Sequence, residues 1–305
     1  MSVWDTSVQK TESDTGFKLF LWKTGATSVS PRGRNLVQVA QKVAVVTGGG
    51  GGIGSALAER LAAEGAKVVV TDLDGTGLEA IVRRIDAEHP GAALAVQADA
   101  SDDAQIASVI DAAERAFGPV DLYFANAGVA AGDQLEPDDA VWDLALDVNV
   151  RAHIRAARRL VPGWIERGEG YFVSTASAAG LLTQIGSAPY SVTKHAAVGF
   201  AEWLSVTYGD KGVRVSCLCP MGVNTKLLTD DAALSATAAR AVTTAGSVLE
   251  PSEVAECVLA AMEAEQFLIL PHPEVLEMYR HKGADYDRWI RGMRRYQATL
   301  LAQPS

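Results

Sequence analysis

The chain has few cysteines, few aromatic residues and no excess of positive charge. Its 3 cysteines in 305 residues are too few for a disulfide framework and are typical of a reducing compartment. A net charge of -10 argues against a nucleic acid or an anionic membrane surface as partner. No apolar run reaches the roughly 18 residues that a membrane-spanning helix needs. The sequence therefore indicates a soluble protein, and we expect a cytoplasmic location.

A secretory signal and a metal site are also missing from the sequence pattern. The start, MSVWDTSVQKTESDTG, lacks the basic end and the apolar stretch of a secretory signal. Cys217 and Cys219 alternate along a strand-like stretch, but two ligands do not make a zinc site, so we expect packed side chains and no metal. Residues 1–40 are polar apart from an apolar island at 17–22. They predict a loosely ordered N-terminal extension; a segment packed on a neighbouring subunit is the alternative.

From residue 41 onward, strand-like and helix-like stretches alternate. Short apolar, β-branched runs predict about seven buried strands, at 42–47, 67–72, 93–99, 121–128, 170–177, 212–220 and 267–271. Apolar residues at helical spacing predict helices between them, at 55–65, 77–88, 102–118, 138–167 and 187–209. This order predicts the α/β class, with a doubly wound parallel sheet (a Rossmann fold) and helices on both faces. Residues 41–305 are expected to form a single domain.

A glycine-rich loop, TGGGGGIG at 47–54, joins the first predicted strand to the first predicted helix. Without side chains, the loop can approach a pyrophosphate closely, and the free N–H groups at the helix start face its charge. Three dinucleotide-binding patterns fit the loop, and downstream residues favour the one whose glycines are Gly48, Gly52 and Gly54. The stretch 49–51 then fills variable positions, where many side chains are expected to fit. Glycine spacing alone leaves a merely flexible loop as the alternative.

Asp72 ends the second predicted strand and points to the cofactor. An acidic side chain there accepts hydrogen bonds from both ribose hydroxyls of the adenosine and repels a 2′-phosphate. Neither the loop nor Leu73 and Asp74 contributes an Arg or Lys to neutralise such a phosphate. NAD is therefore favoured over NADP, with a solvated strand-end carboxylate as the alternative. Asp99, which ends the third predicted strand, is expected to cap the next helix or to accept from the adenine amino group.

Tyr190 and Lys194 lie one turn apart on a predicted helix, so both side chains project from one face. A neighbouring ammonium and the positive nicotinamide ring favour a phenolate, which lowers a tyrosine pKa from its usual value of about 10. Ser177 ends the fifth predicted strand, where a hydroxyl can donate to a substrate carbonyl oxygen. Ser174 and Thr175 are competing hydroxyls, but strand alternation and the spacing to Tyr190 favour Ser177.

At this point residues 41–270 resemble the short-chain dehydrogenase/reductase family. The residues that carry the resemblance are the TGxxxGxG loop, Asp72, Asp99, Asn126-Ala127-Gly128, Asn149, Ser177, Tyr190-x-x-x-Lys194, Pro220 and Thr225. The resemblance implies a seven-stranded doubly wound sheet, one nicotinamide cofactor and metal-free hydride transfer. It implies cofactor contacts by Gly48, Gly51, Gly52, Ile53, Gly54, Asp72, Leu73, Asp99, Ala100, Asn126, Ala127, Gly128, Tyr190, Lys194, Pro220, Val223 and Thr225.

The resemblance also implies a role for each catalytic residue. Ser177 polarises the substrate carbonyl, and Tyr190 is the acid or base. Lys194 binds the ribose and lowers the tyrosine pKa. Asn149 holds a water that passes protons from Lys194 to solvent; a buried amide that stabilises a helix kink is an alternative compatible with that role.

One residue departs from the family pattern: Met221 follows Pro220, where the family usually has glycine. Its side chain is expected either to line the substrate space or to pack under the loop. Residues 226–250 take the position of the family's substrate lid. The apolar residues expected near the substrate are Val129, Ala130, Leu181, Leu182, Tyr208 and Leu228. No Arg or Lys other than Lys194 lies close to the catalytic residues in the sequence, so we expect a neutral, lipophilic secondary alcohol or ketone as substrate.

The C-terminal tract 272–301 is amphipathic and is expected to pack on its own domain, with a neighbouring subunit as the alternative. The resemblance implies a homodimer or homotetramer formed through the helices at 138–167 and 187–209. Two other functions are compatible with parts of the pattern. A sugar-nucleotide epimerase or dehydratase needs a larger C-terminal substrate domain, and the intact catalytic set argues against a non-catalytic, NAD-responsive regulator.

Overall fold

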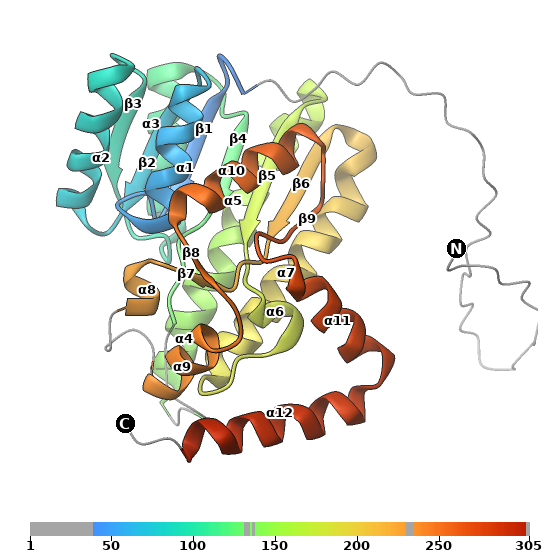
Figure 1. The fold of residues 1–305 in the computed structure, drawn as a ribbon. Helices are drawn as coiled ribbons and strands as arrows, with labels where there is room; N and C mark the ends of the chain where they lie inside the picture. The colour runs from blue at the N-terminus through green and yellow to red at the C-terminus, as the bar shows by residue number, and fades with distance from the viewer. Residues whose placement is uncertain (1–38, 131–134, 136–137, 230–234, 303–305) are drawn as a thin grey trace, which may run out of the picture. The chain divides into compact units, whose positions relative to one another are not determined.

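Seven short, mostly apolar runs form one parallel sheet, as the sequence predicts. The strands are β1 (Val43–Thr47), β2 (Lys67–Asp72), β3 (Ala93–Gln97), β4 (Leu122–Ala125), β5 (Gly170–Thr175), β6 (Val213–Leu218) and β9 (Leu268–Ile269). Their order is β3-β2-β1-β4-β5-β6-β9, and all neighbouring pairs are parallel (Figure 1). The direction of strand succession reverses between β1 and β4. In sheets of this kind, the carboxyl ends of the strands at that reversal form the ligand-binding crevice.

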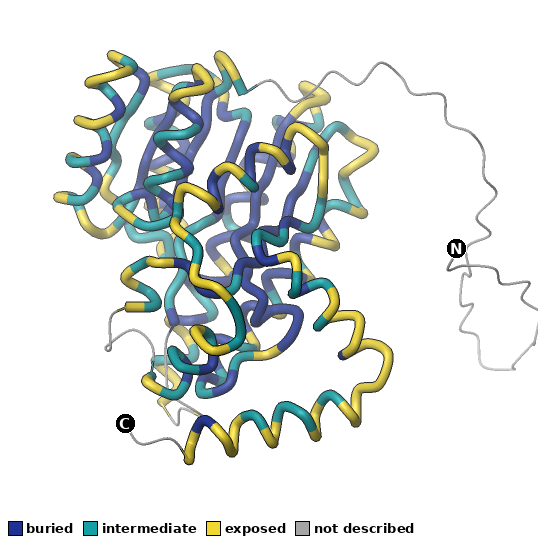
Figure 2. Tube along the Cα trace, in the orientation of Figure 1, coloured by how far each residue is buried: buried dark blue, intermediate teal, exposed yellow. Residues whose placement is uncertain are grey.

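Helices follow the strands along the chain, and several of them cover the two faces of the sheet. They are α1 (Gly52–Ala63), α2 (Gly75–Glu88), α3 (Asp103–Phe117), α4 (Asp139–Leu146), α5 (Ala152–Arg167), α6 (Ala179–Leu182), α7 (Ala188–Tyr208), α8 (Lys226–Thr229), α9 (Ala236–Thr243), α10 (Pro251–Glu263), α11 (Glu274–Ala284) and α12 (Tyr286–Leu301). Because strand side chains alternate, Val43 and Val45 enter one core with α3, α5 and α7, whereas Ala44 and Val46 enter another with α1, α2 and α10. Figure 2 shows the resulting buried sheet between more exposed helices.

The computed structural model describes residues 39–130, 135, 138–229 and 235–302. Residues 36–305 form one compact unit. The predicted N-terminal extension therefore lies outside the described residues, except for its last two positions, 39 and 40. The central part of the predicted lid, 230–234, lies outside them as well.

Several strands end earlier than the sequence predicts, because the chain leaves the sheet at its carboxyl edge to build loops. β3 ends at Gln97, so Asp99 lies beyond it. β4 ends at Ala125, which leaves Asn126 on the following loop. Ser177 likewise follows the last residue of β5. These candidate site residues therefore occupy loops anchored directly on strand ends.

Several local elements were not predicted, among them the short helices α8 and α9. Gly222–Val223 (β7) and Val248–Leu249 (β8) form a small parallel sheet of their own. The short helix α6 follows Ser177. The predicted helical region 138–167 contains a π-helical turn at Asp147–Arg151, between α4 and α5.

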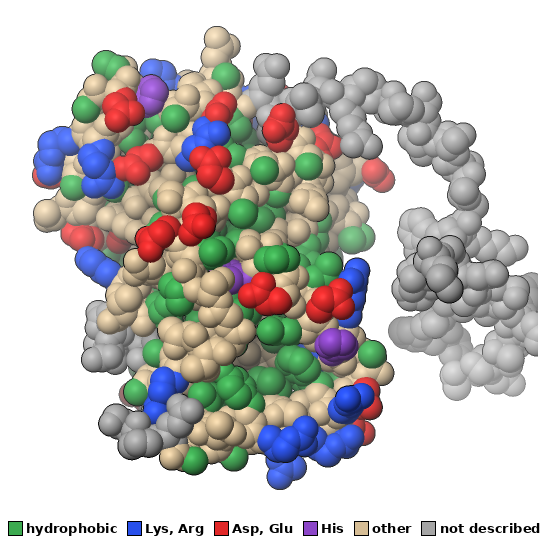
Figure 3. Space-filling model, viewed as in Figure 1, with side chains coloured by type: hydrophobic (Ala, Val, Ile, Leu, Met, Phe, Trp, Pro, Cys, Tyr) green, Lys and Arg blue, Asp and Glu red, His purple; other side chains and the backbone are tan. Residues whose placement is uncertain are grey.

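The C-terminal tract forms α11 and α12, and the end of α12 contacts the rest of the same chain. Leu300 is buried against Ile185 and Ala241, and Met293 and Tyr296 pack against the same cluster. The Tyr296 hydroxyl donates to the carbonyl of Ala241 in the lid helix α9, at 2.9 Å. Hydrophobic side chains gather above α12, while basic residues follow its outer edge (Figure 3). The last helix is thus attached to the lid.

Candidate active site

The three glycines that the sequence pattern selects cannot be replaced without rearrangement of the loop. Gly48 and Gly52 have φ angles of 66° and 54°, a conformation that strains other residues. A Cβ on Gly54 would lie 2.0 Å from the Gly48 carbonyl oxygen. The same three glycines were selected by the sequence pattern, and each is required here by backbone geometry.

The expectation that positions 49–51 tolerate many side chains is wrong for Gly49, and Gly50 has little room. A Cβ on Gly49 would lie 2.9 Å from the Val70 Cβ on the neighbouring strand. A Cβ on Gly50 would lie 3.0 Å from the Asp72 carboxyl group. Only Gly51 has open space, with no atom within 4 Å and an extended backbone. Contacts with the second strand, remote in sequence, impose these limits.

The loop and Asp72 together form a cradle suited to a dinucleotide. Helix α1 starts at Gly52 with no side-chain cap and no acidic residue in its first turn, so its positive end is open to an anion. Asp72 accepts from the Gly50 N–H at 3.0 Å and from the Asp74 N–H at 3.1 Å, which orients its carboxylate beside the loop. Leu73 is exposed beside it, and Ile53 packs on the core beneath α1.

Asp99 is not the cap of helix α3, so that alternative is wrong. Asp102 caps the helix by accepting from the N–H groups of Ala104 and Gln105. The Asp99 carboxylate instead accepts from the Ser101 N–H at 2.7 Å, within its own loop.

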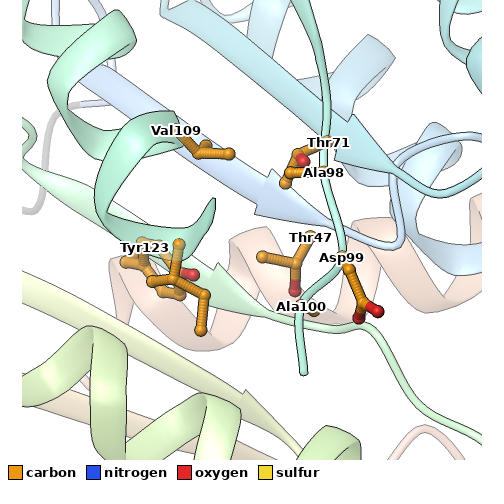
Figure 4. Close-up of a pocket in the computed structure, with 8 residues that line it drawn as sticks. Thr47, Thr71, Ala98, Asp99, Ala100, Val109 and Tyr123 are labelled. Atoms are coloured by element: carbon orange, nitrogen blue, oxygen red, sulfur yellow. The ribbon is translucent and has the colours of Figure 1, made fainter. Parts of the chain in front are cut away.

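Asp99 and Ala100 border a small cavity together with residues of β1, β2 and β4 (Figure 4). The cavity has a volume of about 10 Å³, which is room for a water-sized group and far too little for an adenine ring. An adenine contacting this loop must therefore lie outside the cavity.

Asn126 connects the glycine loop to two strands. Its side-chain amide donates to the Thr47 carbonyl at 3.0 Å and accepts from the Thr175 hydroxyl at 3.2 Å. The Ala127 N–H donates to the Thr47 hydroxyl at 2.9 Å. A Cβ on Gly48 would meet the Ala127 Cα at 2.9 Å, so the two loops touch. These bonds hold the carboxyl ends of β1, β4 and β5 together below the cradle.

Asn149 lies in the π-helical turn and is fully buried. Its side chain accepts from the Val129 N–H and donates to the Val129 carbonyl, both at 2.9 Å, and also donates to the Thr193 hydroxyl at 3.1 Å. Sequence reasoning missed Thr193, although its place directly before Lys194 was available as a signal. A Cβ on Gly128 would lie 3.2 Å from Asn149 Oδ1 and 3.3 Å from Lys194 Nζ, so both atoms border the same small space.

The structure brings Ser177, Tyr190 and Lys194 together. All three are buried, and Ser177 is close enough to the Tyr190 phenol to lower its pKa, while the Ser177 hydroxyl donates to the Pro220 carbonyl at 3.4 Å. Lys194 Nζ lies 5.6 Å from the centre of the Tyr190 ring and donates to the Thr175 carbonyl at 3.0 Å. The competing hydroxyls are engaged elsewhere: Ser174 bonds to the His153 ring at 3.0 Å, and Thr175 to Asn126. Only Ser177 among the three hydroxyls faces the tyrosine.

Burial dominates the electrostatics of this group. It raises the pKa of the Tyr190 phenol, while Ser177 acts in the opposite direction. It also lowers the pKa of the Lys194 ammonium to about 8. The pKa of Tyr190 is thus raised and not lowered as expected, because the phenol is removed from water, and Lys194 is not among the groups that shift it.

The loop after β6 passes beside both the catalytic group and the glycine loop. The Pro220 carbonyl accepts from the Ala178 N–H at 2.8 Å, next to Ser177. A Cβ on Gly52 would lie 2.9 Å from the Thr225 methyl group. The Thr225 hydroxyl donates to the Val223 carbonyl at 3.4 Å, so both proposed nicotinamide contacts lie at the end of this loop.

The Met221 side chain packs under the loop. A Cβ on Gly246 would lie only 2.4 Å from the terminal methyl group of Met221, so this side chain fills the space over Gly246. The Met221 side chain also packs against the core. This position agrees with the second of the two expectations for Met221.

Apolar side chains surround Tyr190. Ala130, Ala179 and Ala238 form a buried cluster with it, and Leu227 and Leu228 pack against that cluster. Leu181 and Leu182 are buried in the neighbouring helix α6. Tyr208 does not belong to this group: it ends α7, eighteen residues and roughly 27 Å along the helix from Tyr190, and its ring meets that of Trp203 edge to face.

Within the described ranges, no three His, Cys, Asp or Glu side chains are placed to hold a metal ion. None of the described helices combines the length and apolarity needed to cross a membrane. Cys217 and Cys219 are buried with their sulfur atoms 3.8 Å apart, as packed side chains.

Comparison with known proteins gives consistent matches. The family model for short chain dehydrogenases matches residues 42–234. The 3beta-hydroxysteroid dehydrogenase 2 of Eggerthella lenta is 32% identical over 194 residues, which cover 62% of this chain and 74% of that protein. The 1-deoxy-11-beta-hydroxypentalenate dehydrogenase of Streptomyces avermitilis is 34% identical over 239 residues, 76% of this chain and 84% of that protein. A short chain dehydrogenase/reductase of Burkholderia phymatum, solved in complex with NAD, superposes with a TM-score of 0.75 at 32% identity, over 82% of this chain and 95% of that one.

Proposed function

Since the chain belongs to the short-chain dehydrogenase/reductase family, we propose that it is an NAD-dependent oxidoreductase that interconverts a secondary alcohol and its ketone. The observation that carries this proposal is the buried group of Ser177, Tyr190 and Lys194 beside an open helix start. The residues beside this group fit a dinucleotide. The glycine loop and the uncapped start of α1 suit its pyrophosphate, and the Asp72 carboxylate suits two ribose hydroxyls.

In the proposed reaction, Ser177 donates a hydrogen bond to the substrate oxygen and holds it at the Tyr190 hydroxyl. Tyr190 takes the alcohol proton during oxidation and returns it during reduction. Lys194 holds ribose hydroxyls and supplies a positive charge, and Asn149 passes the proton onward through a water. When bound, the nicotinamide accepts or donates the hydride at the carbinol carbon. Its positive charge also favours the Tyr190 phenolate, against the effect of burial.

A spectrophotometric screen tests the function. Purified protein with NAD and a panel of cyclic and acyclic secondary alcohols should produce NADH absorbance with some panel members. Absence of turnover across a broad panel, with NAD binding intact, would instead favour the non-catalytic, NAD-responsive regulator.

We propose a neutral, lipophilic substrate, because the described side chains packed around Tyr190 are apolar. One relative is named for a steroid alcohol, which agrees with such a substrate. Another is named for pentalenate, a carboxylate, so matched neutral and carboxylate alcohols belong in the same panel. Much faster turnover of the carboxylates would contradict the proposal of a neutral substrate. It would leave the proposed interconversion of alcohol and ketone unchanged.

The preference for NAD is expected to depend on Asp72. Asp72→Ala should weaken NAD binding by about 10- to 100-fold, the effect of losing charge-assisted hydrogen bonds, and should improve NADP binding relative to NAD. Because Asp72 also holds the Gly50 N–H, the ratio of the two affinities is the decisive quantity. Titration of each cofactor measures it.

Glu79→Ala is the matched control, because it removes the same charge from the exposed face of α2, where Glu79 pairs with Arg83. An unchanged NAD to NADP ratio in Asp72→Ala would show that Asp72 does not select the cofactor.

We also propose a homodimer or homotetramer formed through the helices at 138–167 and 187–209. Leu144 on α4 and Val192, Trp203 and Val206 on α7 leave large apolar side chains exposed, Val206 by 87%. Light scattering coupled to size-exclusion chromatography should give a mass of two or four chains, and Val206→Asp should lower it. A monomeric mass for the unaltered protein contradicts this proposal. The cytoplasmic location stays a prediction.

A further inference from the structure

His272 is a buried histidine outside the catalytic group, and both of its ring nitrogens are engaged. It lies between β9 and α11 and is 1% exposed. Nδ1 accepts from the Met221 N–H at 3.1 Å, and Nε2 bonds to the Ser247 carbonyl at 3.1 Å. A backbone N–H can only donate and a carbonyl can only accept. The ring therefore carries its proton on Nε2 and presents a lone pair to Met221.

The backbone around His272 is restricted before any ligand binds. Pro271 precedes the histidine and Pro273 follows it, and each proline fixes its own φ angle. The residue before a proline is also restricted, which applies to His272 itself. The ring is thus held on a stiff segment at the edge of the main sheet.

The partner of this ring is the middle of the loop that leads to Val223 and Thr225. The start of the loop is held by the bond from the Ala178 N–H to the Pro220 carbonyl. Its end is held by the β7–β8 pairing. Between these anchors, His272 holds the Met221 N–H, and through Ser247 it also reaches the strand that pairs with β7. Met221 fills the space over Gly246, so the loop is fixed by both backbone and side chain.

We propose that His272 is a positioning residue of the cofactor site, acting through the Met221 N–H to hold the loop that presents Val223 and Thr225. The inference rests on the proposed function for the identity of the bound group, a nicotinamide cofactor. The two hydrogen bonds of His272 are formed within the protein and do not depend on the bound group. His272 itself touches no reacting atom.

Two variants of His272 separate its two hydrogen bonds. In His272→Asn, the side-chain oxygen takes the place of Nδ1 and can accept from the Met221 N–H. In His272→Gln, the longer side chain reaches the place of Nε2 and can donate to Ser247, but Met221 loses its acceptor. The measurements are hydrogen exchange at the Met221 amide, by mass spectrometry of the NAD-free protein, and the dissociation constant for NAD.

We expect His272→Gln to speed exchange at Met221 and to weaken NAD binding, each by roughly five- to tenfold, and His272→Asn to stay near the unaltered protein in both. In steady-state kinetics, the KM for NAD should rise in His272→Gln while the KM for the alcohol stays nearly constant. If NAD binding weakens equally in both variants, the bond to the Met221 N–H is not the cause. If NAD binding and exchange at Met221 are unchanged in both variants, His272 does not hold the loop. Each result overturns the proposal.

Unaltered protein provides a test that does not require either variant to fold. Its Met221 amide should exchange slowly compared with an exposed loop amide. Fast exchange at Met221 in protein that binds NAD would end this inference and leave the proposed function intact. Protein that binds no NAD at all would end the proposed function, whatever the exchange at Met221 shows.

Discussion

Tyr190→Phe is expected to lower kcat by about 10²- to 10⁴-fold, while the dissociation constant for NAD stays within a factor of about two. The variant keeps the aromatic ring, which packs against Ala130, Ala179 and Ala238, and removes only the hydroxyl. That hydroxyl is the group whose pKa Ser177 affects and that we propose to exchange a proton with the substrate. Turnover of a substrate found in the alcohol screen, together with NAD titration, measures both quantities.

Tyr208→Phe is the matched control, because it makes the same chemical change on the same helix. Tyr208 ends α7, where its ring meets that of Trp203 edge to face and its ring centre lies 5.3 Å from Lys211 Nζ. Its loss of a hydroxyl should leave kcat unchanged. Near-normal turnover in Tyr190→Phe would refute the assignment of Tyr190 as the acid or base.

Lys194→Met is expected to lower kcat on the order of 10²-fold and, at pH 7, to raise the free energy of unfolding. The ammonium is fully enclosed, and burial lowers its pKa to about 8, whereas an unfolded lysine has a pKa of about 10.4. Between these values the unfolded chain binds a proton that the folded chain does not. The free energy of unfolding of the unaltered protein should therefore rise as the pH increases from about 8 to about 10.4. Below about 8, Lys194 is protonated in both states, and the full cost of burying its charge lowers the free energy of unfolding.

The expected gain at pH 7 is on the order of 1–3 kcal/mol, because the lost hydrogen bond to the Thr175 carbonyl offsets part of the relieved burial cost. Urea unfolding of both proteins across this pH range measures it, and their difference cancels the other titrating groups. Lys67→Met is the control, since Lys67 donates to the Gly91 carbonyl at 2.9 Å in an exposed setting and should show no such gain. A stability difference that does not change with pH would contradict the lowered lysine pKa.

The main features of the site were predictable because parallel strands end at one edge of the sheet. Once the alternation of strands and helices is read correctly, residues after β1, β2, β4 and β5 must converge there. This is why Asp72 and Asn126 contact the glycine loop although they are distant in sequence, and why Ser177 follows a strand that ends at the same edge. The helical spacing of Tyr190 and Lys194 then places both on one face.

The rest depends on contacts that leave no local pattern. The limits at Gly49 and Gly50 come from Val70 and Asp72, on another strand. The β7–β8 pair has two residues in each strand, too few for a visible alternation. His272 is a single histidine between prolines, and only the fold shows that Met221 is its partner. The raised Tyr190 pKa reflects how tightly helices α6 and α9 enclose the phenol, which no spacing of residues reveals.

The π-helical turn at Asp147–Arg151 gives the chain one residue more than a continuous α-helix from α4 to α5 would need. A π turn holds one residue more than an α turn, so the loss of a single residue there would convert one into the other. The stripe of Ala156, Leu160 and Trp164 on α5 would then keep its phase and stay buried. Such a deletion would instead remove the widened turn that places Asn149 against Val129 and Thr193. The extra residue therefore serves the position of Asn149, and the packing of α5 does not depend on it.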